Sequence, residues 1–308
     1  MSIGSNLLEK YQIRKTKAQK TAFIEYVKGF AANLGYPLEI KGKGDSVRNI
    51  VIGNLERAEV VYTAHYDTPP VMILPNFITP KNFLIYLAYQ LFLVALMLVL
   101  PLGAALALKY TVFNGVGSFV PLLVFLLLYY AELYLMMYGP ANKHNANDNT
   151  SGVATVLGIM ERLAGKNLDV AFVLFDCEER GLLGSKMLAK QKKNIMKDKL
   201  VVNFDCVSEG DKMLFAVRKG AVGDLDLLRS SFASRSGIEC LCESRGVFYP
   251  SDQSSFKRGV GVASLRRGML GVLYTSRIHT PRDTVFDEGN IEFLVSGSER
   301  LAWQICAK

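Results

Sequence analysis

Two of the three histidines in this 308-residue chain occur in short polar segments that also carry carboxylates. His65 precedes Asp67 by two residues and directly follows the apolar run 60–64, and His279 occurs late in the chain. Other acidic residues that follow apolar runs or open a predicted helix are Asp148, Glu178, Glu179 and Asp205. Imidazole and carboxylate groups together suit borderline divalent metals, zinc first. These residue types therefore predict a metal site able to activate water for hydrolysis.

The number of donor groups fits two zinc ions that share one bridging carboxylate. Each ion would take one histidine, one further carboxylate and the bridge, and would keep one position for water. The donors that fill this scheme are His65, Asp205, His279 and Glu179, with Asp148 as the bridge. We therefore expect two Zn²⁺ ions as cofactors.

Two carboxylates remain outside this ligand set, and each has a role of its own. Neighbouring loop residues usually point apart, so Glu179 can bind a metal while Glu178 faces the water as general base. Side chains at i and i+2 of an extended chain project to the same side. Asp67 can therefore accept a hydrogen bond from the second ring nitrogen of His65 and fix its tautomer.

Alternating strands and helices would bring these segments together. Apolar runs that predict strands lie at 38–41, 49–52, 60–64, 169–175, 200–204, 213–217, 260–264 and 270–274. Segments that predict helices include 16–34, 152–164, 224–234 and 290–306. Such an alternation indicates an α/β fold with helices on both faces of a sheet. Ligands of open α/β sheets bind at the carboxyl ends of the strands, where the predicted donors lie.

Two long uncharged segments interrupt this alternation. No Asp, Glu, Lys or Arg occurs at 82–108 or at 110–131, and about 20 apolar residues suffice for a helix to cross a bilayer core. A buried core helix is the alternative, but the first segment is apolar on every face. Glu132 interrupts the second segment near its end, where a charge can reach the headgroups. The predicted parts are a transmembrane hairpin at 82–138, with helices at about 83–108 and 117–138, and a discontinuous catalytic domain, 1–81 and 139–308.

The formal net charge of +8 fits either a nucleic-acid-binding or a membrane-proximal protein. No basic–aromatic pattern or known motif supports nucleic acid as a partner. Lysine and arginine cluster at 14–20 and 186–199, and residues 1–35 lack a signal-peptide pattern. Because such clusters stay on the cytoplasmic side, we predict an integral membrane protein with two helices and a cytoplasmic catalytic domain. Lipid is the expected partner of the hairpin. The hairpin sequence does not indicate which protein, if any, it binds.

Five of these segments, in the same order along the chain, resemble the motifs of the di-zinc aminopeptidases, metallopeptidase family 28. They are TAHYDTP at 63–69, NDNTSG at 147–152, EERGLLGS at 178–185, NFD at 203–205 and HTPRDT at 279–284. The resemblance covers most of the chain except the hairpin. It implies a mixed, mostly parallel sheet of about eight strands flanked by helices.

The resemblance also implies a role for each predicted site residue. One zinc would be held by His65, Asp148 and Asp205, and the other by Asp148, Glu179 and His279, with Glu178 as base and Asp67 as the outer partner of His65. The family commonly has Ser-Asp-His before its last strands, whereas this chain has Gln253 after Ser251 and Asp252. That departure concerns substrate handling, because the replaced histidine is not among the expected ligands.

We expect a membrane-anchored zinc exopeptidase, an aminopeptidase acting on peptides. Glutaminyl cyclisation or deacylation on the same fold is one alternative, and cyclases of this fold use one zinc. A non-catalytic receptor or scaffold is another, although such relatives lose ligands that this chain retains. Residues expected to be structural or to lie at the surface are His144, Asp176, Cys177, Cys206 and Asp252.

Overall fold

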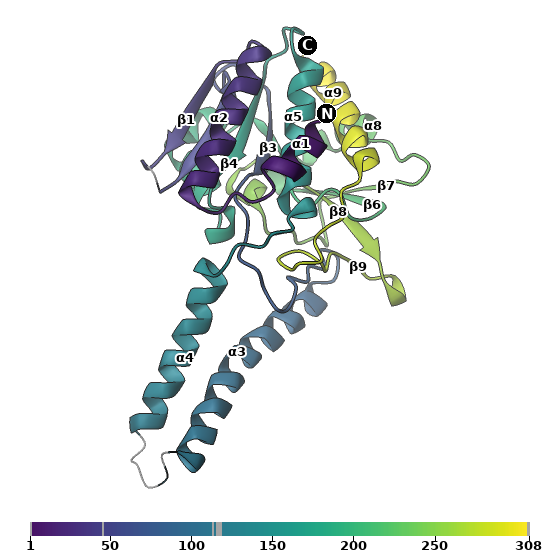
Figure 1. The fold of residues 1–308 in the computed structure, drawn as a ribbon. Coiled ribbons are helices and arrows are strands. Elements are labelled where there is room, and N and C mark those ends of the chain that lie inside the picture. The colour runs from purple at the N-terminus through teal and green to yellow at the C-terminus, as the bar shows by residue number, and fades with distance from the viewer. Residues whose placement is uncertain (1, 45, 113, 115–118, 307–308) are drawn as a thin grey trace.

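The computed structural model describes residues 2–44, 46–112, 114 and 119–306, and its main body is built around one mixed sheet (Figure 1). The strands are β1 (Leu38–Gly42), β2 (Arg48–Gly53), β3 (Val60–His65), β4 (Val170–Phe175), β5 (Leu200–Phe204), β6 (Lys212–Val217), β7 (Glu239–Glu243), β8 (Gly259–Arg267) and β9 (Leu273–Tyr274). Eight of them follow the order β1-β2-β4-β3-β5-β8-β6-β7, and β9 pairs with β8. Within that path four of the seven neighbouring pairs are parallel. The predicted fold class is thereby confirmed.

Helices cover both faces of this sheet. Those of the larger core are α1 (Ile3–Lys10), α2 (Lys17–Asn33), α5 (Gly152–Leu163), α8 (Leu225–Ser231) and α9 (Glu288–Cys306). The opposite face packs against α6 (Leu183–Gln191) and α7 (Lys193–Met196). In β3, Val60 and Tyr62 belong to the first core and Val61 to the second, as the period of two in a strand requires. Each such buried side chain contributes about 1.5–3 kcal/mol relative to exposure.

The structure differs from the expected elements at three places. Helix α1 and strand β7 were not expected. Strand β7 lies at the end of the strand order beside β6, and its side chains are partly exposed. Its sequence, ECLCE, therefore lacks the apolar run of a central strand. The strand expected at 270–274 shrinks to β9, because Leu270 adopts a left-handed φ of 60° in the preceding turn.

A helical hairpin projects from the body where the expected insertion lies (Figure 1). Its helices are α3 (Phe83–Thr111) and α4 (Phe119–Tyr138). Both are long and apolar enough to cross a membrane. Of the most apolar 18-residue stretch of each helix, only 11% in α3 and 6% in α4 is buried. Neither helix is therefore a buried core helix. Helix α3 extends three residues beyond the predicted end at 108, and the predicted start of the second helix at 117 lies outside the described residues.

Candidate metal centre

The predicted ligands meet at the carboxyl ends of the central strands. His65 ends β3, Asp205 directly follows β5, and Glu179 lies in a 3-10 turn (Glu178–Arg180) just after β4. Asp148 comes from the turn that precedes α5, and His279 follows β9. Five segments that are distant in the sequence thus place their side chains around one point.

Asp148 lies between the two histidines. Its Oδ1 is 3.3 Å from Nε2 of His65, and its Oδ2 is 3.1 Å from Nε2 of His279. A second carboxylate approaches each ring: Asp205 Oδ1 lies 3.6 Å from His65 Nε2, and Glu179 Oε2 lies 3.4 Å from His279 Nε2. The five side chains therefore form two groups of three that share Asp148.

The donor set fits zinc. Oε1 of Glu179 and Nδ1 of His279 are buried and have no hydrogen-bond partner in the part of the chain that the structure describes. One combination of donor atoms within 4.8 Å of one another joins His65, Asp148 and Glu179. Buried imidazole and carboxylate donors at such spacing are typical of zinc ligands.

The carboxyl groups of this cluster impose a strongly negative potential on one another. Burial raises the pKa of Glu178 and Glu179 well above the ordinary value, and neighbouring carboxylates raise it further. Burial by itself would lower the pKa of His65, but Glu178 and Asp148 raise it well above its usual value. A cation in the centre would offset this repulsion.

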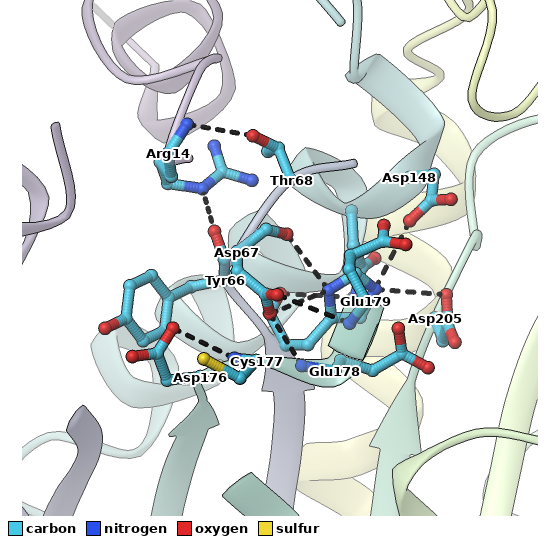
Figure 2. Close-up of polar contacts among 12 residues, drawn as sticks. Arg14, Tyr66, Asp67, Thr68, Asp148, Asp176, Cys177, Glu178, Glu179 and Asp205 are labelled. Atoms are coloured by element: carbon cyan, nitrogen blue, oxygen red, sulfur yellow. Dashed lines mark hydrogen bonds and ion pairs between the residues drawn. The ribbon is translucent and has the colours of Figure 1, made fainter. Parts of the chain in front are cut away.

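Asp67 organises the turn that carries the two glutamates (Figure 2). Its Oδ1 accepts a hydrogen bond from the backbone N–H of Glu178 at 3.0 Å, and its Oδ2 accepts one from Glu179 at 3.3 Å. The predicted contact with His65 is longer, since Oδ1 lies 3.6 Å from Nδ1. The backbone oxygen of Asp67 is nearer to that ring nitrogen, at 3.1 Å. The main chain therefore orients the imidazole, while the carboxylate holds the glutamate turn.

Asp283, to which no role was assigned from the sequence, holds the Asp148 loop. Its carboxylate oxygens accept hydrogen bonds from the backbone N–H groups of Asn147 (2.8 Å) and Asp148 (3.0 Å). Burial and the nearby Asp148 raise the pKa of Asp283 to about 8. A side chain at position 152 would approach Phe204 O to 2.3 Å, so only Gly152 lets the loop pack against β5. The Asp148–Asn149 peptide bond is cis.

Asp205 is positioned by residues from the segment before β8. Its Oδ2 accepts a hydrogen bond from Ser251 Oγ at 2.5 Å, and its carbonyl accepts one from the Tyr249 hydroxyl at 2.9 Å. Gln253 stands where the family commonly has histidine. Its side-chain amide donates to Tyr249 O at 2.7 Å and so stabilises the segment that positions Asp205. The Cys206 thiol donates to Asp205 Oδ1 at 3.1 Å. Burial and neighbouring carboxylates raise the pKa of the Cys206 thiol. Donor atoms of Cys206, Asp148 and Asp205 lie within 4.8 Å of one another.

Arg14 reaches the back of the site from the N-terminal segment and is fully buried (Figure 2). Its guanidinium donates to the carbonyls of Tyr66 and Tyr11 and, at 3.2 Å, to Thr150 Oγ1. Its own backbone N–H donates to Thr68 Oγ1 at 3.0 Å. Burial lowers the pKa of Arg14 to about 10, partly offset by Asp67 and Asp148. Arg14 thus joins the loop after β3 to the loop that carries Asp148.

The residues expected to be structural or to lie at the surface differ in burial and in their hydrogen-bond partners. Asp176 pairs with Lys20 and accepts a hydrogen bond from the Arg48 N–H, which fits a structural role. His144 is exposed, as expected for a surface residue. Asp252 is fully buried, and neither of its carboxylate oxygens has a hydrogen-bond partner in the described ranges. Burial raises its pKa to about 7. Asp252 therefore adds to the buried acidity around the centre.

A comparison with known protein families finds one that matches this chain. The sequence model of Peptidase family M28 matches residues 134–292, which is just over half of the chain and holds four of the five motifs. The His65 segment lies outside the match and joins the site through the parallel pairing of β3 with β4 and β5. No curated protein sequence matches the chain.

Solved structures share the fold at low sequence identity. The Legionella pneumophila LapA aminopeptidase aligns with a TM-score of 0.59 and 14% identity, over 99% of this chain and 70% of its own. A leucine aminopeptidase precursor from Bacteroides thetaiotaomicron gives 0.59 and 13%, covering 98% and 94%. A glutaminyl cyclase from the same organism gives 0.60 and 13%, covering 98% and 95%. These likenesses show the fold alone.

Proposed function

Because the chain belongs to peptidase family M28, we propose that it is a zinc-dependent exopeptidase of the aminopeptidase type, which removes N-terminal residues from peptides. The position of Asp148 carries this proposal, since one of its oxygens faces His65 and the other faces His279. A carboxylate that faces two separate imidazoles is suited to bridge two cations.

Each side chain then has a defined task. His65, Asp148 and Asp205 would hold one zinc, and Asp148, Glu179 and His279 the other. When bound, the two ions would supply Lewis-acid activation of a water molecule and of the scissile carbonyl. Glu178 takes a proton from the water and returns it to the leaving amine.

The proposal is tested by metal analysis and substrate turnover on the same sample. We expect about two zinc equivalents per chain and cleavage of aminoacyl substrates with a free amine. N-acetylated versions of these substrates should not be cleaved. Equal cleavage of blocked and free substrates would contradict an aminopeptidase.

Glutaminyl cyclisation is the alternative that the shared fold keeps open. A peptide with N-terminal glutamine distinguishes the two reactions, because cyclisation releases ammonia and leaves the peptide bonds intact. Hydrolysis instead releases free glutamine. A product that has lost only ammonia, together with one zinc equivalent, would favour the cyclase.

We also propose that the hairpin formed by α3 and α4 spans a membrane and anchors the catalytic domain at its cytoplasmic surface. The exposed apolar helices support this, and so does the turn between β8 and β9. In that turn Met269 is 92% exposed and Leu270 is 100% exposed. Thr275, just after β9, pairs with Ile78 in the segment that enters α3. An apolar turn so close to the hairpin base would touch the bilayer surface.

Membrane fractionation of two proteins tests this placement. We expect the full chain to stay in the membrane pellet after alkaline carbonate washing, because two apolar helices are costly to transfer into water. A variant in which a short Gly-Ser linker replaces 83–138 should move to the soluble fraction. If the catalytic domain lies on the cytoplasmic side, as proposed, a fluorescent protein fused after residue 308 should fluoresce. Release of the full chain by carbonate would contradict the anchor.

A further inference from the structure

A cavity of about 320 Å³ opens beside the metal centre. Asp67 and Glu179 form one part of its wall. Met137 and Tyr138, in the last turn of α4, form another part. The cavity therefore lies between the proposed catalytic residues and the base of the hairpin, and its volume is in the range of small-molecule sites.

Several cations line this cavity, and three of them are held by uncharged partners. Lys15 Nζ donates to the carbonyl of Met137 at 3.3 Å. The guanidinium of Arg180 lies over the Tyr138 ring, 4.9 Å from its centroid. Arg48 donates to Thr21 Oγ1 at 2.8 Å and to the Lys17 carbonyl at 3.2 Å, and its Nε is buried without a partner among the described residues.

Local structure holds these cations in place. Lys15 lies between the buried Arg14 and the N-cap of α2, where Thr16 and Gln19 form a capping box. Arg180 ends the 3-10 turn that begins with Glu178, so its backbone is tied to the metal centre. Burial lowers the pKa of Lys15, and the positive charge of Arg180 lowers it further, against an opposing effect of Glu179. Two cations that line the same cavity repel each other, and an anion between them would relieve the repulsion.

The carboxylates that line the cavity already have partners. Asp176 pairs with Lys20, and Asp67 accepts the two backbone hydrogen bonds of the glutamate turn. Glu179 faces His279. None of the three forms an ion pair with Lys15, Arg48 or Arg180 in the described parts of the chain.

We propose that this cavity is an anion subsite that binds a carboxylate of the peptide substrate, with Arg180 and Lys15 as the residues that determine this specificity. The proposal rests on the proposed peptidase function and adds the substrate class to it. An arginine fork binds a carboxylate through two parallel hydrogen bonds, and a lysine adds a point charge. The carboxylate belongs either to an acidic N-terminal side chain or to the C-terminus of a short peptide.

Two pairs of peptides distinguish a C-terminal carboxylate from an acidic side chain. Within each pair the carboxylate is replaced by an amide of nearly the same shape. Leu-Gly-Gly is compared with its C-terminal amide, and Asp-Gly-Gly amide with Asn-Gly-Gly amide. For the zinc-loaded full chain in detergent, we expect kcat/KM to be at least about tenfold higher for the carboxylate member of at least one pair. Arg180→Gln and Lys15→Gln should each reduce this ratio toward one, through a larger fall in kcat/KM for the carboxylate member than for the neutral member.

Matched variants exclude a general electrostatic effect. Lys28→Gln removes an exposed charge on α2 that pairs with Glu25 outside the cavity, and it should leave both rates unchanged. Arg180→Lys keeps the charge and should retain part of the preference. If Arg180→Gln slows charged and neutral peptides equally, the cations only balance the metal centre and the subsite is refuted.

Calorimetric binding to the Glu178→Gln protein separates this proposal from the peptidase proposal. In this background the same four peptides can be titrated whether or not the parent enzyme cleaves them. Tighter binding of a carboxylate peptide, lost on adding Arg180→Gln, would support the subsite even if no peptide were hydrolysed. Equal binding of both members in both pairs, or no binding at all, would overturn it.

Discussion

Replacing Glu178 by glutamine should abolish peptide hydrolysis while zinc stays bound. Glutamine keeps the shape of the side chain but cannot accept a proton from water. Loss of a positioned general base lowers rates by about 10²–10⁴-fold, and kcat should fall by at least this amount. The five proposed ligands are untouched, so metal analysis of the same preparation should match the parent enzyme.

Two further variants make this result specific. Glu161→Gln changes an exposed glutamate on α5 and should leave kcat unchanged. Glu178→Asp keeps the acid but withdraws it by one methylene, so partial activity would show that proton transfer depends on reach. A Glu178→Gln enzyme with near-parental kcat would exclude Glu178 as the base.

Replacing Asp148 by asparagine should remove zinc from both halves of the site and eliminate activity. Asp148 is the side chain whose two oxygens face the two histidines, at 3.3 Å and 3.1 Å. Asparagine offers one oxygen and no charge, so neither ion would keep a charged bridge. Loss of an outer-shell partner already costs roughly 10–100-fold in metal affinity, and loss of a bridging ligand should cost more. Zinc content and turnover measured after dialysis against a weak chelator would show both losses.

Single-ion variants supply the comparison for Asp148. Asp205→Asn should weaken only the zinc beside His65, and Glu179→Gln only the zinc beside His279, each leaving about one equivalent. Asp226→Asn changes an almost fully exposed carboxylate and should leave both ions bound. Two retained equivalents in Asp148→Asn would contradict the bridging role.

The sequence was sufficient to predict which five side chains the fold brings together around Asp148. Polar residues at the ends of apolar runs stand out locally, as His65 does after 60–64, and the carboxyl ends of parallel strands meet at one edge of a sheet. Helical and strand periodicity likewise predicted the α/β class and two long apolar helices. These features depend on near neighbours in the chain, and composition and spacing carry that information.

The residues that support the ligands were not predictable in the same way. Asp283 binds the backbone of the Asp148 loop across 135 positions, and Arg14 reaches Thr150 across 136. Nothing near Arg14 in the sequence distinguishes it from the other basic residues at 14–20. Arg14 supports the site because its side chain is buried. That burial results from the way α1, α2 and the loop after β3 pack together.

Local sequence pattern specifies secondary structure, and it therefore predicts the chemical groups at this site, their order and the strand ends that present them. Which of these groups face one another depends on how the strands and loops pack in the folded chain. Asp67 illustrates the difference, since its spacing from His65 predicted a contact with the ring. In the folded chain β3 lies beside β4, so the backbone of Glu178 approaches the Asp67 carboxylate more closely than the imidazole does.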